Sequence, residues 1–226
     1  MTSEDDYASR RDSQASTATP ASSILGKARE MHMHEWRLEM LTIGIVIGST
    51  RPGRVGRGVG EWVYKKALDH GGAEFRLVDL KDFALPILDE TTVPMMAAGT
   101  KPHTVRWAEQ IAGFDGFVFV TPEYNRGIPA SLKNAIDYLY AEWNNKAAGF
   151  VGYGADGGVR SVEHMRGVLS MVRMATVGPQ VALTLADDFQ EHTGFAPRAK
   201  HEPMMSAMLT DLVSWGEALR DVRASA

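Results

Sequence analysis

The apolar residues of this chain of 226 residues are sparse up to about position 40 and recur in short runs from there on. Each run is nearly unbroken, which is typical of a strand buried on both faces of a sheet. The runs are Leu41–Ile47, Phe75–Leu80, Gly116–Val120, Ala147–Tyr153 and Val181–Leu185. We therefore expect five buried strands.

Segments with the apolar spacing of a helix lie between these runs and after the last one. They are Val59–Ala67, Val105–Ala112, Leu132–Leu139, Val162–Val172 and Met205–Leu219. Strands that alternate with helices predict an α/β fold in three layers, with a parallel sheet, right-handed crossovers and helices on both faces. Residues 39–226 are accordingly expected to form one domain.

The first 38 residues are expected to form a disordered or weakly ordered tail. Residues 1–23 hold six Ser, three Thr and four Ala, so they bury too little apolar surface to offset the entropy of ordering. The acidic residues Glu4, Asp5, Asp6 and Asp12 argue against a mitochondrial presequence, in which such residues are rare.

The amino-acid composition excludes several kinds of binding partner and of catalytic group for this protein. The formal charge of −4, from 24 basic and 28 acidic residues, is too balanced for a protein that coats nucleic acid. There is no apolar run of roughly 18 residues and no secretory signal, so we expect a cytoplasmic protein with neither membrane nor nucleic acid as partner. Cysteine is absent, which excludes disulfides and a thiolate nucleophile.

Three loops at predicted carboxyl ends of strands are candidates for a ligand site, because ligands of open α/β sheets bind there. The first, residues 48–60, carries five glycines together with Ser49, Thr50, Arg51 and Arg54. Glycine backbone, hydroxyls, guanidinium groups and a helix N-terminus together indicate a phosphate ligand. Neither a Walker loop nor a dinucleotide fingerprint fits the spacing, which leaves the phosphate of a mononucleotide.

The second and third loops offer groups that suit a flat ring. In residues 121–129, positions 123–128 lie between two prolines and display Tyr124 and Asn125, an aromatic face beside polar donors. Tyr124 taken alone is equally consistent with a half-buried loop aromatic. Residues 152–161 contain four glycines, which allow a ring to pack closely against the backbone.

Together these motifs resemble the NAD(P)H-dependent FMN reductases of the flavodoxin-like fold. The resemblance rests on GSTR in the first loop, on PEYN followed by IPASLKNAIDYLY at the second, and on GYGADGGVR at the third. It extends over residues 41–223 and implies an open five-stranded sheet in the order 2-1-3-4-5. Alternation of strands and helices does not by itself choose between doubly wound topologies.

The resemblance also implies where FMN binds. Its phosphate would lie on Ser49, Arg51 and the backbone of Arg54, Val55 and Gly56. The residues implied for the isoalloxazine ring are Pro122, Glu123, Tyr124, Asn125 and Arg126 from the second loop, with Gly154, Ala155, Asp156 and Gly157 closing its other edge.

The implied reaction transfers a hydride from NADPH or NADH to the flavin and then electrons to a quinone-type or other small acceptor at the same place. We therefore expect ping-pong kinetics and no indispensable acid, base or nucleophile, because the flavin carries the chemistry. Tyr124 and Arg126 would contact the nicotinamide or the acceptor. The alternative is an electron-carrier flavodoxin, or a nucleotide-binding domain without reductase activity.

Because members of the family that this chain resembles form dimers, the resemblance implies that this protein is a homodimer or a dimer of dimers. Tyr138, Tyr140 and Trp143 are candidate interface aromatics, although packing inside one chain explains them equally well.

Two further groups of residues are expected to have no part in the chemistry. His32 and His34 lack further ligands at metal-binding spacing, so no metal site is expected. Asp187 and Asp188 are interpreted as solvated charges.

Overall fold

The computed structural model describes residues 40–191 and 194–225, so the predicted tail lies outside the described residues. The elements are β1 (Thr42–Ile47), α2 (Gly56–His70), β2 (Glu74–Asp79), α3 (Leu80–Phe83), α4 (Pro102–Ala112), β3 (Gly116–Pro122), α5 (Ala130–Asp137), η1 (Ala141–Trp143), β4 (Ala147–Gly154), α6 (Val159–Met171), β5 (Ala175–Thr184), α7 (Leu185–Asp188), β6 (Phe189–Gln190), β7 (Gly194–Phe195), η2 (Ala199–His201) and α8 (Glu202–Ala224).

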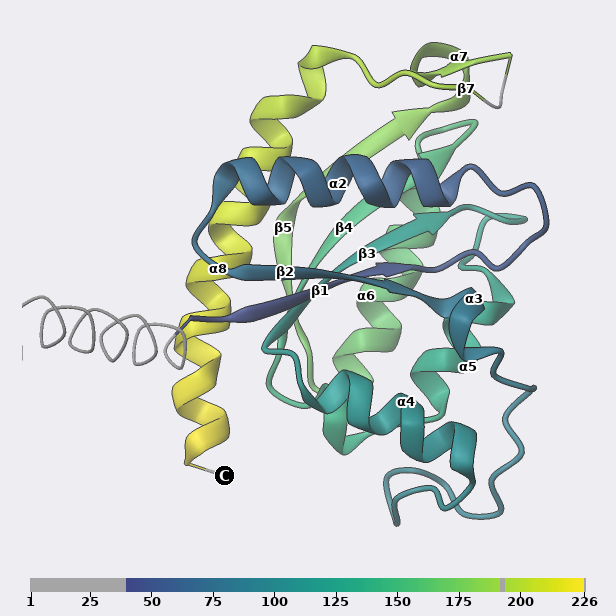
Figure 1. Cartoon of the computed structure of the whole chain (residues 1–226), viewed down its shortest axis with the longest axis vertical. Coiled ribbons are helices and arrows are strands. Elements are labelled where there is room, and N and C mark those ends of the chain that lie inside the picture. The colour runs from purple at the N-terminus through teal and green to yellow at the C-terminus, as the bar shows by residue number, and fades with distance from the viewer. Residues whose placement is uncertain (1–39, 192–193, 226) are drawn as a thin grey trace, which may run out of the picture. The chain divides into compact units, whose positions relative to one another are not determined.

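Five strands form one parallel sheet in the order β2-β1-β3-β4-β5, which confirms the predicted fold (Figure 1). Helices α2 and α8 cover one face of the sheet, and α4, α5 and α6 cover the other. The predicted helical segments fall within these helices, except that the segments ending at Leu139 and Val172 extend past the ends of α5 at Asp137 and α6 at Met171.

Neighbouring residues of a central strand point to opposite faces, so the sheet separates two apolar cores. Phe117 and Phe119 pack with α4, α5 and α6, whereas Val118 and Val120 pack with α2 and α8. Every residue of β3 and β4 is buried. Burial on both faces explains why these strands read as unbroken apolar runs.

Strand β5 differs from its prediction. It begins at Ala175, well before the expected Val181, and Leu185 already belongs to α7. The pairing with β4 shifts between Ala148 and Phe150, where the β5 partners change from Thr176 to Gln180. Gly178 and Pro179 lie in this bulge. A Gly-Pro pair is typical of a strand end, but an edge strand accommodates it as a bulge.

Three side chains are more buried than the sequence suggested. Of the three candidate interface aromatics, Tyr138 and Trp143 are completely buried in the core of a single chain, so for them the alternative of packing within one chain holds, and Tyr140 is partly buried against the same core. Asp188 is also buried, which contradicts its interpretation as a solvated charge. Its Oδ1 accepts hydrogen bonds from His201 at 2.9 Å and from the Arg198 backbone at 3.2 Å. The carboxylate thereby fixes the chain between β5 and α8.

An irregular segment, residues 84–101, connects α3 to α4 and was not predicted. Asp89 anchors it: its carboxylate accepts from Tyr138 Oη at 3.0 Å and from Lys101 Nζ at 2.7 Å. These bonds, that of Lys101 first, lower the pKa of Asp89 to about 2. The segment is therefore a tethered strap, although it contains no regular structure.

Among the described residues, no helix is long and apolar enough to cross a membrane. The same residues contain no group of three or more His, Cys, Asp or Glu placed to hold a metal ion. His32 and His34 lie outside the described residues.

Candidate functional site

The carboxyl ends of the parallel strands border a cleft of about 370 Å³. It is lined by Arg51, Gly53, Arg54, Val55, Pro122, Glu123, Tyr124, Tyr153, Gly154 and Leu185. These residues come from the three loops singled out in the sequence and from the end of β5. The volume falls within the range of roughly 300 to 1,000 Å³ that is typical of small-molecule sites.

The first loop leaves the N-terminus of helix α2 facing the cleft. Val55 is the N-cap residue, and α2 has neither a side-chain cap nor an acidic residue in its first turn. The backbone N–H groups of a first turn have no partner within their own helix and carry the positive end of the helix dipole. This end of the cleft is therefore suited to an anion.

Arg54 is held at the same end of the cleft by a buried ion pair. Its Nη2 donates to the carboxylate of Asp79 at the end of β2, and that carboxylate is buried. The Arg54 Nε is also buried and has no hydrogen-bond partner among the described residues. An unsatisfied buried donor costs about 1 to 3 kcal/mol. An acceptor atom of a ligand would recover that energy.

Gly56 and Tyr153 fit against each other at the start of α2. A Cβ added to Gly56 would lie 2.4 Å from Tyr153 Oη, so only glycine fits while that hydroxyl is present. Burial, and then the neighbouring Tyr124, raise the pKa of the Tyr153 hydroxyl. The hydroxyl therefore keeps its proton at neutral pH and can donate it in a hydrogen bond.

Tyr124 links the second loop to the first. Its hydroxyl lies 3.0 Å from Ser49 Oγ, and Ser49 is buried. The Tyr124 side chain keeps 39% of its surface exposed, so part of the ring is open to a ligand. This bond fixes the distance between the loop expected to hold a phosphate and the loop expected to hold a ring.

The tip of the second loop is a tight turn with an uncommon backbone. Tyr124 and Gly127 exchange two backbone hydrogen bonds of 3.0 Å. Between them Asn125 has φ 49° and Arg126 has φ 67°. Left-handed values at both central residues are those of a type I′ turn, in which Asn suits the first position and Gly the second. Arg126 occupies the glycine position.

Two carboxylates of the predicted site, Glu123 and Asp156, form ion pairs with Arg160 in the first turn of helix α6. Glu123 accepts from the Arg160 backbone N at 3.1 Å and from its Nη1 at 2.6 Å. Asp156 accepts from Arg160 Nη2 at 2.7 Å. The N-terminus of α6 is thus already neutralised by the Glu123 carboxylate, whereas the N-terminus of α2 has no acidic side chain in its first turn. An incoming phosphate is therefore favoured at α2.

Half of the predicted site residues line the cleft. Those are Arg51, Arg54, Val55, Pro122, Glu123, Tyr124 and Gly154. Ser49 and Gly56 are buried directly behind the lining, against Tyr124 and Tyr153 respectively. The others, which do not line it, are Asn125, Arg126, Ala155, Asp156 and Gly157. Contact of any of these residues with a cofactor stays a prediction.

Three residues of the candidate site were not found from the sequence. Leu185 lies at the carboxyl end of β5, where the general rule for ligand sites could have placed it. Tyr153 is the next-to-last residue of the buried strand β4, and only its close approach to Gly56 distinguishes it from a core aromatic. Arg160 carried no signal, because its ion pairs join residues from separate loops.

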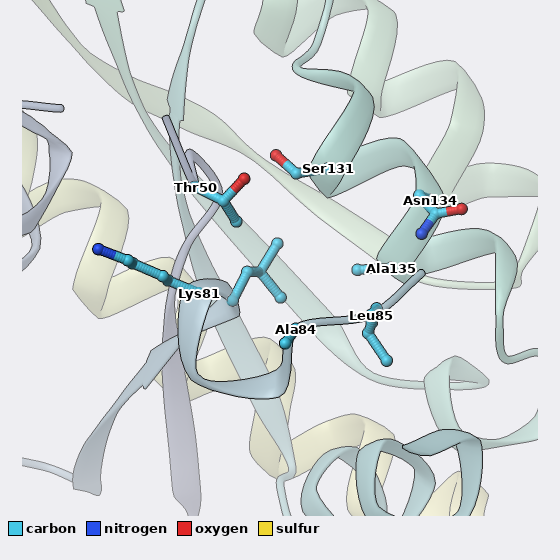
Figure 2. Close-up of a pocket in the computed structure, with 8 residues that line it drawn as sticks. Thr50, Lys81, Ala84, Leu85, Ser131, Asn134 and Ala135 are labelled. Atoms are coloured by element: carbon cyan, nitrogen blue, oxygen red, sulfur yellow. The ribbon is translucent and has the colours of Figure 1, made fainter. Parts of the chain in front are cut away.

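A second hollow, of about 130 Å³, includes one residue of the first loop, Thr50, in its lining (Figure 2). It is lined by Thr50, Leu80, Lys81, Ala84, Leu85, Ser131, Asn134 and Ala135. Asn134 is occupied with the backbone of Pro86 and Leu88 at 2.6 and 2.8 Å, and Ser131 donates to the Gly48 carbonyl. Figure 2 shows the Lys81 amine pointing away from the other lining side chains. The polar groups Asn134 and Ser131 of this hollow are already bonded to the protein backbone, so we place the ligand in the larger cleft.

Comparison with known proteins gives consistent results. The sequence model of a family described as NADPH-dependent FMN reductase matches residues 41–188. An NAD(P)H-dependent FMN reductase of Schizosaccharomyces pombe is 40% identical over 146 residues, which are 64% of this chain and 73% of the relative. A quinone reductase of Pseudomonas putida is 29% identical over 193 residues, which are 81% of this chain and 99% of the relative.

The fold is also that of a solved flavoenzyme. FerB, an NAD(P)H:(acceptor) oxidoreductase from Paracoccus denitrificans, superimposes with a TM-score of 0.62 at 22% identity. The superposition covers 79% of this chain and 98% of that one.

Proposed function

The chain belongs to the NADPH-dependent FMN reductase family, and on that premise we propose that it binds FMN in the cleft and carries electrons from NAD(P)H to a small acceptor such as a quinone. The observation that carries this proposal is the pairing of two environments in one cleft. An uncapped helix N-terminus lies beside Arg51 and Arg54 at one end, and Tyr124 and Gly154 lie at the other.

The residues present fit FMN at both ends. Its phosphate would take the N–H groups at the start of α2, the Arg51 guanidinium and the orphaned Nε of Arg54. Its ring would lie between the second and third loops, against Tyr124 and the backbone of Gly154. When bound, FMN supplies the capacity to accept a hydride from NAD(P)H and to reduce an acceptor.

The protein's own part is binding, orientation and charge. The ion pairs of Glu123 and Asp156 with Arg160 occupy both carboxylates, so neither is free as a general base. Backbone donors of the third loop would stabilise negative charge on a reduced ring, as preorganised dipoles do in anion holes. We propose that NAD(P)H and the acceptor use the same opening in turn, which predicts ping-pong kinetics. Steady-state rates that require both to be bound together would contradict this.

Arg51→Ala tests the phosphate end of the cleft. A charge-assisted hydrogen bond contributes about 1.5 to 3 kcal/mol, so FMN affinity should fall roughly ten- to a hundredfold. The measurement is quenching of flavin fluorescence during titration of apoprotein. Arg76→Ala is the matched control, because Arg76 is an exposed arginine on β2 that pairs only locally, with Glu74. Equal affinities of the two variants would refute the phosphate assignment.

A further inference from the structure

Five arginines lie around the cleft, and their charges are compensated unequally. Arg54 is paired with Asp79, Arg57 with Glu61 and Asp79, and Arg160 with Glu123 and Asp156. Arg51 and Arg126 are exposed and have no carboxylate partner among the described residues. Two positive charges at the cleft therefore remain available to anionic ligands.

These two charges occupy different places. Arg51 lines the cleft beside the start of α2, where it would serve the flavin phosphate. Arg126 does not line the cleft, because it stands at the tip of the turn next to Tyr124. A group held by Arg126 thus lies outside the flavin pocket and beside its ring end. The dinucleotide that approaches the flavin ring carries its negative charges on its phosphate groups, beyond the nicotinamide, so one of these groups can reach a guanidinium outside the pocket.

The backbone at Arg126 is unfavourable for any residue with a side chain. Its φ of 67° lies in the left-handed region, which costs an L-residue free energy that glycine does not incur. In the described residues its guanidinium makes no ion pair that would offset this strain. Strained positions without a structural benefit are typical of functional sites.

We propose that Arg126 binds the 2′-phosphate of NADPH and makes the protein prefer NADPH to NADH; this rests on the proposed function. The 2′-phosphate is a monoester with a charge of about −1.5 to −2 at neutral pH, and guanidinium binds such a group in a bidentate manner. The pyrophosphate, which both dinucleotides share, has a single charge on each phosphorus. An exposed guanidinium gains little from a weakly charged partner in water. The doubly charged group is therefore the one that Arg126 can distinguish.

Arg126→Gly tests this proposal, with Arg173→Gly as the matched control. Arg173 is also exposed and left-handed, with φ 57°, but it lies just before β5, at the amino edge of the sheet. Both substitutions remove an exposed arginine and relieve the same strain. The FMN-loaded variants are assayed with NADPH and with NADH, and binding of 2′,5′-ADP and of 5′-ADP is measured by calorimetry.

The wild-type protein should prefer NADPH. Arg126→Gly should lower kcat/KM for NADPH about tenfold and weaken 2′,5′-ADP binding by a similar factor. Values for NADH, 5′-ADP and FMN retention should change less than about twofold, and Arg173→Gly should change nothing. Arg126→Lys keeps the charge but not the bidentate geometry, so it should keep only part of the preference. Equal losses with NADPH and NADH would assign Arg126 to the shared pyrophosphate and overturn the proposal, as would no loss with either. If neither dinucleotide reduces the wild-type holoprotein, the proposed function itself fails.

Discussion

Tyr153 and Gly56 share one space at the start of helix α2. A Cβ on Gly56 would lie 2.4 Å from the Tyr153 hydroxyl, and this hydroxyl is also near enough to Ser49 to influence it electrostatically. Because Ser49 in turn contacts Tyr124, three of the loops around the cleft are connected through these few side chains. The position of the predicted phosphate site relative to the ring site is thus set by contacts between individual residues.

Gly56→Ala should destabilise the protein by about 1 to 3 kcal/mol, since the new methyl overpacks against a buried tyrosine. Tyr153→Phe removes only the hydroxyl and should cost about 1 kcal/mol or less. In the double variant the nearest ring atom to the new methyl is Cζ, at 3.3 Å, so its cost should be clearly below the sum of the two. Urea unfolding of the four proteins measures this coupling. Strict additivity would show that the hydroxyl does not fill the space.

From the sequence, the candidate site could be predicted only for residues whose position follows from the loop that carries them. Arg51, Tyr124 and Gly154 line the cleft because the loops that carry them follow parallel strands, whose ends meet at one edge. Glu123 and Asp156 look like free carboxylates in the sequence, but Arg160 pairs with both. Such pairs depend on the distance between loops, which no local pattern records.

Lys146 directly precedes strand β4, and its side chain caps the C-terminus of helix α4. Its Nζ is buried and donates to the carbonyls of Ile111 and Ala112 at 2.8 and 3.3 Å. Burial, and to a lesser degree the charge of Arg223, lower the pKa of Lys146 to about 8. The ammonium thus satisfies carbonyls that α4 leaves unpaired, in surroundings that disfavour its charge.

The stability contributed by Lys146 should rise with pH. Between about pH 8 and the unperturbed pKa of roughly 10.4, the amine is neutral in the folded chain and protonated in the unfolded chain. Unfolding then takes up a proton, so the free energy of unfolding increases with pH through this window. Relative to Lys146→Met, the wild type should gain on the order of 2 to 3 kcal/mol between pH 8 and 10.5, as measured by urea unfolding. A constant difference across that range would contradict the lowered pKa.

Strands and helices were predicted well from the sequence where burial alone determines the pattern of apolar residues along them. Strands β3 and β4 are covered on both faces, so their unbroken apolar runs identify them directly. Strand β5 is an edge strand whose bulge takes up Gly178 and Pro179, and its first half therefore resembles a loop. The strap of residues 84–101 is held by side-chain bonds to Asp89 and Asn134, which leave no periodic signal. The strand order came from the family resemblance and not from the pattern.

Among the described residues, the two most exposed large apolar side chains, Ile87 and Met96, both lie on the strap of residues 84–101. Ile87 and Met96 are 82% and 80% exposed, and Val93 and Met95 are more than half exposed. Apolar side chains gathered on one exposed segment mark surfaces that associate. Since Tyr138 and Trp143 are in the core, we expect this strap to form a homodimer interface.

Light scattering during gel filtration tests the dimer. The wild-type protein should have about twice the chain mass of 24.7 kDa at micromolar concentration. The combined change Ile87→Asp and Met96→Asp should move it toward the monomer, because a charge buried in an apolar interface is strongly unfavourable. Met171→Asp, at another exposed methionine on α6, should leave the mass unchanged. A monomeric wild type would reject the dimer, and an unaffected double variant would reject the strap as its interface.

The reductase activity of the whole molecule depends on one event, the reduction of bound flavin by a nicotinamide dinucleotide. Anaerobic stopped-flow mixing of the FMN-loaded protein with NADPH follows that event through the visible absorbance of oxidised flavin. We expect the absorbance to be lost without any acceptor present and to return when benzoquinone is added. Protein that retains FMN but keeps its oxidised absorbance with both NADPH and NADH would contradict the reductase function and leave a flavin carrier in its place.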